Sequence, residues 1–232
     1  MHWWRQLWDI SFSLSSLLAA LLIGVALGNL VWGIPLDRNH EFIGTFISLL
    51  HPYALLLGLT TIALFLMHGA IYVVLKTEGE LQQKAKRWTQ NGIIFFILTY
   101  VTTTMSTLLY VPHMADPFRQ HPLFLGIPLI TLLAVANIPR EVVRGKLFRA
   151  FLSSCVAMIS LMALFGVGLY PHLVVSNPQP EWSLTIHNAA SSAKTLKIML
   201  VMVILGIPLV LAYTVSIYWI FRGKVKLEEG SY

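Results

Sequence analysis

The chain has 232 residues, of which 56% are hydrophobic and 11% are charged, and its formal net charge is +6. About a quarter of the residues in a soluble domain are charged, so this composition excludes an ordinary soluble protein and favours a polytopic membrane protein. The basic residues fall in short loops between apolar runs, which is the positive-inside pattern of membrane topology and gives no sign of nucleic-acid binding. The single cysteine, Cys155, excludes an intrachain disulfide.

The N-terminal segment is rich in tryptophan and leads into the first apolar run. Trp3, Trp4 and Trp8 predict an aromatic belt at headgroup level. The run that follows is too long for the apolar core of a cleavable signal peptide. We therefore expect the first span to remain in the mature chain.

Six apolar stretches are long enough to form transmembrane helices, since about 20 helical residues cross a hydrocarbon core of about 30 Å. They cover approximately residues 10–32, 52–75, 90–111, 122–138, 150–170 and 196–221. The first five contain no Lys, Arg, Asp or Glu, and the sixth has only Lys197 near its start. The predicted fold is an all-α polytopic membrane helical bundle that forms a single transmembrane domain over residues 1–232.

The fourth stretch, 122–138, is short and contains Pro128, so a re-entrant segment is the alternative. Loop charges favour a full crossing. The segments 76–88 and 139–149 and the C-terminal tail with Arg222, Lys224 and Lys226 are basic, and they share one side with the N-terminus only if all six stretches cross. Both termini are then expected on the cytoplasmic side.

His68 is the ionisable side chain in the interior of the second span. Thr61, His68 and Tyr72 are spaced by seven and four residues, which predicts that they share one helix face. A histidine at this depth could be a haem ligand, part of a polar relay for protons, or a hydrogen-bond partner of a quinone. The alternative is a neutral histidine bonded to a neighbouring helix. Haem ligation is disfavoured, because a haem with two histidine ligands would need a second histidine deep in the spans, and the sequence has none.

The first span carries small residues at four-residue intervals, Ala20, Gly24 and Gly28, followed by Asn29. This spacing allows two helix backbones to approach closely, and the amide of Asn29 can bond across helices. We therefore predict a close helical neighbour for this face, within the chain or in another subunit.

The third span carries a stripe of hydroxyl side chains, Thr99, Thr103 and Ser106, with Thr102 and Thr107 beside it. Such a stripe could line a water-filled proton path. Threonines in spans more often bond to backbone carbonyls or to neighbouring helices, and this interpretation is favoured.

Most histidines fall in the predicted outer loops. They are His40, His51, His113, His121, His172 and His187. A metal site built from them is conceivable, but no pair has the spacing that would make such a site specific. We therefore predict no metal site, and no P-loop, G-x-S-x-G, H-E-x-x-H or CxxC motif indicates a catalytic residue.

Four segments together resemble one family. They are GVALGNLVWGIPLD (24–37), LLHPYALLLGL (49–59), HGAIYVVLKTEGEL (68–81) and the C-terminal TIHNAASSAKTLKIMLVMVILGIPLVLAYTVSIYWIFRGKV (185–225). This pattern resembles subunit II of cytochrome bd-type quinol oxidases over essentially the whole chain. Family members have about nine transmembrane helices, so the resemblance implies that the chain matches the last six and lacks the first three.

The resemblance implies a non-haem subunit of a membrane-bound quinol:oxygen oxidoreductase in the bacterial cytoplasmic membrane. Such a subunit supports assembly of the haem-bearing subunit I and aerobic respiratory electron transfer. Haems b and d are expected in that partner, quinol is the substrate of the complex, and this chain binds no cofactor. Membrane lipid is the other expected partner, and the chain alone is not expected to be catalytic.

Two other functions are compatible with the same spans. A stand-alone multipass transporter would need deep charges or broken helices around a midplane site, and Pro128 and Pro208 are weak signals of this kind. A truncated fragment without independent activity would leave the face around Gly24 without its partner.

Overall fold

The structure is a computed structural model that describes residues 2–224. Its helices are α1 (His2–Trp32), α2 (Pro52–Lys76), α3 (Gly79–Tyr110), α4 (Asp116–Gln120), α5 (Gly126–Val143), α6 (Leu147–Leu169) and α7 (Ala193–Ile220). Short 3-10 turns are η1 (Ile47–Leu49), η2 (Pro112–Ala115), η3 (Pro122–Leu125) and η4 (Pro180–Trp182). Six of the described helices are long and apolar enough to cross a membrane, which confirms the predicted fold class.

The fourth spanning helix is longer than the sequence pattern suggested. Together with η3, α5 extends from Pro122 to Val143 and passes through Pro139. Pro128 lies in the first turn of α5, where backbone N–H groups have no intrahelical acceptor, so it does not interrupt the helix.

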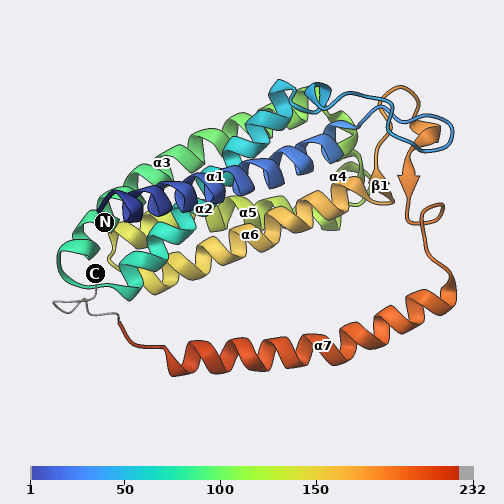
Figure 1. The fold of residues 1–232 in the computed structure, drawn as a ribbon. Helices are drawn as coiled ribbons and strands as arrows, with labels where there is room; N and C mark the ends of the chain where they lie inside the picture. Colours follow the sequence, from blue (N-terminus) through green and yellow to red (C-terminus); the bar gives the residue numbers. More distant parts are fainter. Residues whose placement is uncertain (1, 225–232) are drawn as a thin grey trace.

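The first six helices form a bundle in which α1 lies along α2, α2 along α3, and α5 along α6 (Figure 1). Helix α6 also contacts α2, which closes the bundle. Ten buried apolar side chains from α2, α3, α5 and α6 make the main core. They are Ala63, Met67, Ile71, Ile93, Phe96, Ala134, Val135, Ile138, Ala150 and Ala157.

The contact between α1 and α2 depends on glycine. A Cβ atom at Gly24 would lie 2.6 Å from the Cα of Gly58, and one at Gly28 would lie 2.7 Å from the Cα of Ala54. No side chain fits in so small a space, so the two backbones touch directly. The close neighbour predicted for the Gly24 face is therefore α2 of the same chain.

Two long connections meet at the end of the bundle opposite the start of α1. The backbone N–H of Ile34 donates to the carbonyl of Val175 at 2.9 Å, and the N–H of Asn177 donates back to Ile34 at 3.1 Å. Next to this contact, the strands β1 (His172–Val174) and β2 (Leu184–Thr185) pair in an antiparallel hairpin. The segments 33–51 and 170–192 thus form one ordered cap.

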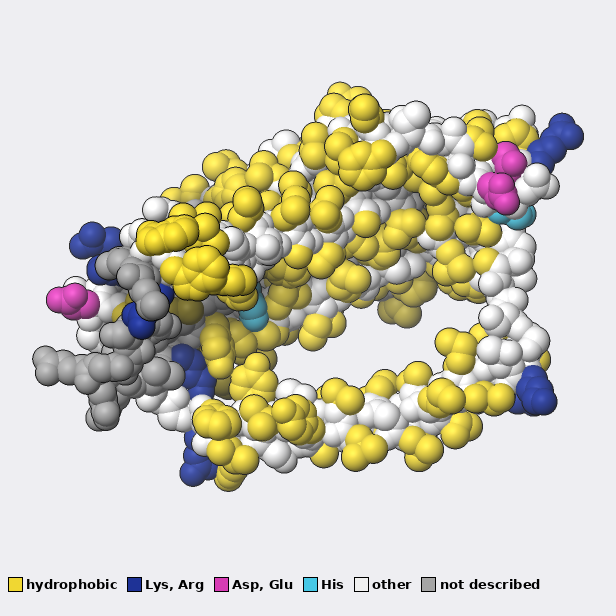
Figure 2. Space-filling view, viewed as in Figure 1, with side chains coloured by type: hydrophobic (Ala, Val, Ile, Leu, Met, Phe, Trp, Pro, Cys, Tyr) yellow, Lys and Arg dark blue, Asp and Glu magenta, His cyan; other side chains and the backbone are white. Residues whose placement is uncertain are grey.

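Helix α7 stands apart from the bundle (Figure 1). The hydroxyl of Ser192 caps its start by accepting from the N–H of Thr195. None of its residues is buried, and open space separates it from α1–α6 along most of its length (Figure 2).

At its far end α7 returns to the turn between α2 and α3. The ammonium group of Lys76 donates to the carbonyls of Phe221 and Arg222 at 3.3 and 3.2 Å, and Lys224 pairs with Glu78 at 3.2 Å. Figure 2 shows Lys and Arg side chains gathered at this end, where the described chain also begins. Lys226 lies outside the described residues.

Candidate functional site

His68 lies at the contact between α2 and α6. Its Nδ1 atom is 2.8 Å from the hydroxyl of Ser154, and its ring stacks on Phe151 with centroids 4.8 Å apart. Tyr72 contacts the same phenyl ring at 5.7 Å. Phe151 thus joins His68 and Tyr72 through apolar contacts.

Ser154 is hydrogen-bonded both to His68 and to the backbone of its own helix. The hydroxyl of Ser154 donates its one proton to the carbonyl of Phe151 at 2.7 Å. With its proton on this carbonyl, the hydroxyl oxygen is left to accept from Nδ1 of His68. This geometry matches the alternative of a neutral histidine bonded to a neighbouring helix.

The three residues predicted to share a face do not form a connected polar path. Thr61 donates to the carbonyl of Leu57 in its own helix, and its hydroxyl lies where a Cβ of Gly24 would be. Among the described residues, no hydrogen bond joins Thr61, His68 and Tyr72 to one another. Asn29, next to Gly28 in α1, donates to the carbonyls of Val25 and Leu49, both at 2.8 Å.

Hydroxyl groups line the contact between α2 and α3. Tyr53 and Thr107 are hydrogen-bonded at 2.8 Å, and Thr60 and Thr103 at 2.7 Å. Because Thr107 also donates to the carbonyl of Thr103, and Thr60 to that of Leu56, the protons of these threonines are already used. The hydrogen bonds of each pair therefore end at a backbone carbonyl.

The remaining threonines of the predicted stripe bond within α3. Thr99 donates to the carbonyls of Phe95 and Phe96, and Thr102 to that of Leu98. These bonds agree with the favoured interpretation of the stripe as helix packing.

The outer histidines hold the loops and helix ends in place. A ring nitrogen of His40 lies 2.8 Å from the carbonyl of Trp182, and one of His113 lies 3.0 Å from that of Val31. His51 caps α2, because its Nδ1 accepts from the N–H of Ala54 at 3.4 Å. Burial lowers the pKa of the His51 imidazole below its usual value. Among residues 2–224, no three His, Cys, Asp or Glu side chains are grouped so as to hold a metal ion.

One buried carboxylate escaped the sequence interpretation. Glu141 is only 3% exposed, and its Oε2 has no hydrogen-bond partner among the described residues. Its other oxygen lies 3.5 Å from the guanidinium of Arg144. The sequence pattern placed Glu141 in a loop because the apolar run stops at Ile138, whereas α5 continues for another turn.

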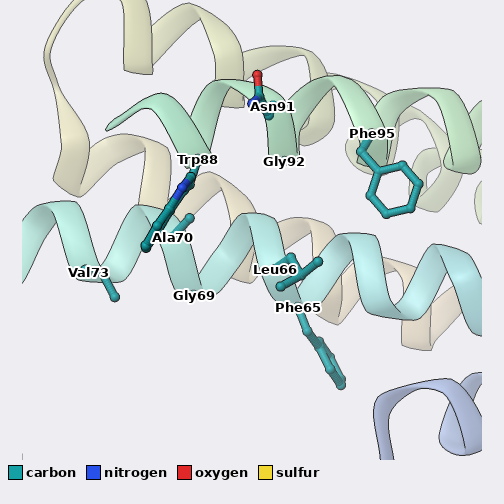
Figure 3. A pocket seen from close by; sticks show the side chains of 9 residues that line it. All are labelled: Phe65, Leu66, Gly69, Ala70, Val73, Trp88, Asn91, Gly92 and Phe95. Atoms are coloured by element: carbon teal, nitrogen blue, oxygen red, sulfur yellow. The ribbon is translucent and has the colours of Figure 1, made fainter. Parts of the chain in front are cut away.

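A lateral groove lies between α2 and α3 and has a volume of about 580 Å³. We call it the α2–α3 groove. Figure 3 shows the side chains that line it, and Asn91 is the one polar side chain among them. The lining residues are Phe65, Leu66, Gly69, Ala70, Val73, Trp88, Asn91, Gly92 and Phe95.

His68 lies apart from both cavities of the described residues. His68 lies among Phe151, Ser154 and Tyr72, and it lines neither this groove nor the smaller cavity between α3 and the α5–α6 turn. The six histidines predicted in outer loops all lie at the opposite end of the bundle from the α2–α3 turn, so none of them can ligate opposite His68.

Comparison with known proteins identifies the relatives of the chain. The cytochrome bd-I ubiquinol oxidase subunit 2 of Escherichia coli K12 is 26% identical over 97% of this chain and 68% of its own length. A probable cytochrome oxidase subunit 2 of Haemophilus influenzae is 26% identical over 96% of the chain and 66% of its own length. The cytochrome bd ubiquinol oxidase subunit 2 of Bacillus subtilis is 25% identical over 97% and 66%.

The six apolar helices and the bacterial relatives together indicate a multi-pass protein of the bacterial inner membrane. The family model of cytochrome bd terminal oxidase subunit II matches residues 1–221. A subunit II implies a complex with a subunit I. The resemblance inferred from the sequence is confirmed: the chain belongs to the cytochrome bd terminal oxidase subunit II family.

Proposed function

We propose that the chain is the non-haem subunit II of a membrane-bound quinol:oxygen oxidoreductase. It supports assembly of a haem-bearing subunit I and thereby aerobic respiratory electron transfer. The complex oxidises quinol, reduces oxygen to water and takes up protons from the cytoplasm. Haems b and d belong to the partner, and this chain contributes helices and no redox group.

The observation that carries this proposal is the isolation of α7. A helix of 28 residues buries none of its side chains against the described chain. The N-terminal half of α1, residues 3–19, is exposed in the same way. In a membrane, helices associate through side-chain packing and interhelical hydrogen bonds. Two long helical surfaces without partners are what a subunit offers to the helices of another subunit.

The charge distribution supports a cytoplasmic position for both termini. The segments 76–88 and 139–149 and the end of α7 carry most of the Lys and Arg residues. They lie at one end of the molecule, and the positive-inside rule assigns this end to the cytoplasm.

Affinity purification from the native membrane with an absorbance spectrum tests the proposal. We expect a haem-bearing partner to copurify and to give b-type and d-type bands. A matched preparation of the chain with Gly206→Leu in α7 should lose this partner, because the substitution alters a surface that the chain itself leaves free. Isolation of a haem-free protein that moves a solute would refute the proposal.

A further inference from the structure

We propose that the α2–α3 groove binds a membrane phospholipid with an anionic headgroup. One acyl chain lies along the groove, and the phosphate lies beside Lys84 at its cytoplasmic end. This site goes beyond the oxidase role and does not depend on it.

The floor of the groove consists of small residues. Gly69 and Ala70 leave room on α2, and no heavy atom lies within 4 Å of the position that a Cβ of Gly69 would take. Gly92 lets the two helices approach at the base of the groove, because its Cβ would lie 3.3 Å from the Cα of Met67. A volume of about 580 Å³ is within the range of about 300–1,000 Å³ that small-molecule sites occupy. The groove is therefore large enough for a ligand.

The walls are suited to a narrow apolar chain. The side chains of Phe65, Leu66 and Trp88 project beside the floor and are 45%, 50% and 61% exposed. From Phe65 to Val73 the groove follows α2 for roughly 12 Å along its axis. A second helix could pack here only if its axis came within about 8–10 Å of the axes of α2 and α3, and the projecting rings prevent this. An acyl chain, which lies parallel to the helices in a bilayer, fits between them.

The charge at one end selects the headgroup. Lys84 precedes Trp88, Asn91 and Phe95 by four, seven and eleven residues, so all four lie on the same face of α3. Trp88 directly precedes the predicted span 90–111, at the depth where tryptophan meets headgroups. Lys84 is exposed and makes no ion pair with any described residue. Its long side chain can reach a phosphate while its methylene groups cover apolar surface.

Gly69→Leu fills the groove without a clash, and Gly166→Leu is the matched control. Gly166 lies in α6, also has no neighbour within 4 Å of its Cβ position, and lies outside the groove. After detergent purification of the protein with its partner, the phospholipid that remains bound is measured by native mass spectrometry. We expect the unmodified protein and Gly166→Leu to retain a phospholipid that Gly69→Leu loses.

Lys84→Gln tests the headgroup in a protein whose groove is unchanged. We expect this variant to bind phosphatidylglycerol about fivefold more weakly and to lose less affinity for phosphatidylcholine, whose choline group offsets the phosphate charge, both added from mixed micelles. The proposal is wrong if Gly69→Leu retains the lipid, if the molecule lost is a quinone without phosphorus, or if Gly69→Leu instead releases a protein partner. Equal phosphatidylglycerol binding by Lys84→Gln would also overturn it. Quinol oxidase turnover, measured in the same preparations, reports separately on the proposed function.

Discussion

Helices α2 and α7 are similar in length and composition but differ completely in packing. They have 25 and 28 residues, and their most apolar windows have mean hydropathy values of 2.0 and 2.6. A third of the α2 window, 33%, is buried, whereas the figure for α7 is 0%. The more hydrophobic helix is thus the one without neighbours in its own chain.

This difference shows that hydrophobicity does not decide which membrane helices associate. In lipid, an apolar side chain gains no transfer free energy by leaving the acyl chains for another apolar surface. Helix α2 instead offers small residues that α1 can approach, such as Ala54 and Gly58, and hydroxyls that α3 can match, such as Thr60. Substitutions that act on one helix and not on the other test this difference in packing.

The largest effect is expected from Gly24→Leu. The new side chain would meet the Cα of Gly58 at 2.6 Å, so α1 must separate from α2. We expect the unfolding free energy to fall by about 3 kcal/mol, measured by thermal or denaturant unfolding in detergent. Gly206→Leu in α7, where no atom lies within 4 Å, should leave the stability of the isolated chain unchanged. Equal losses in both variants would mean that α7 is packed as tightly as α2.

Asn29→Leu should have the next largest effect. Asn29 is 7% exposed, and its amide donates to the carbonyl of Leu49 in η1, just before α2. The substitution would leave this carbonyl without that partner. The expected loss in unfolding free energy is about 1–2 kcal/mol. Ser13→Leu, in the exposed half of the same helix, is the control, since Ser13 bonds only to the carbonyl of Asp9. A stable Asn29→Leu variant would contradict the role of this amide in the contact between α1 and α2.

Tyr53→Phe removes the hydroxyl that joins the start of α2 to Thr107 of α3. Tyr53 is 6% exposed, and loss of its hydroxyl leaves the half-buried hydroxyl of Thr107 with one partner fewer. We expect a decrease of about 1 kcal/mol in unfolding free energy. Thr102→Val should have no measurable effect, because Thr102 is exposed and bonds only within α3. If Tyr53→Phe does not change the unfolding free energy, small residues are the main link between α2 and its neighbours.

The cap of α2 should make its start sensitive to pH, unlike the serine cap of α7. Burial lowers the pKa of His51 in the folded protein, so the unfolded chain binds a proton more readily. The contribution to stability is fully present above the unfolded pKa of about 6.5 and is lost as the pH falls toward the folded value. Unfolding measured between pH 8 and pH 5 should therefore show destabilisation that His51→Asn, which keeps a capping side chain, abolishes. An identical pH profile in this variant would assign the effect to another group.

The smallest effect is expected where α7 rejoins the bundle. Lys76→Met removes two exposed hydrogen bonds to the carbonyls of Phe221 and Arg222. The change in unfolding free energy should stay below about 0.5 kcal/mol, as for exposed pairs. Limited trypsin digestion should nevertheless cleave faster after Arg222 than in the unmodified chain. An unchanged cleavage rate would show that the end of α7 is held by other contacts.

The long helices of this fold could be predicted from the sequence. Hydropathy indicated the six long helices, because an uncharged run that crosses a bilayer has almost no other stable structure. The spacing of Gly24 and Gly28 predicted a close contact, but it could not name α2 as the neighbour, since any small surface would satisfy it. Helix α5 extends past the predicted span 122–138, because a helix can continue beyond the apolar run that marks its membrane segment, as it does through Pro139 and Glu141.

The candidate site was harder to predict. The shared face of Thr61, His68 and Tyr72 follows from helical periodicity, but their partners depend on α1 and α6, which lie far away in sequence. Neither the hydrogen bond between His68 and Ser154 nor the groove beside Gly69 has a sequence signal. Both depend on how two packed helices are positioned relative to each other, and the residue pattern of a single segment does not specify that position. A polar relay at these residues stays a prediction.

The hydroxyl pairs between α2 and α3 have a consequence for a membrane that stores a proton gradient. A Grotthuss wire needs hydroxyls or waters that can pass a proton on and then reorient. Thr60 and Thr107 have no such freedom, because backbone carbonyls hold their protons in place. Among the described residues, the hydrogen bonds of each pair therefore end on a backbone carbonyl, and they stabilise the contact between the helices without continuing into a path for protons.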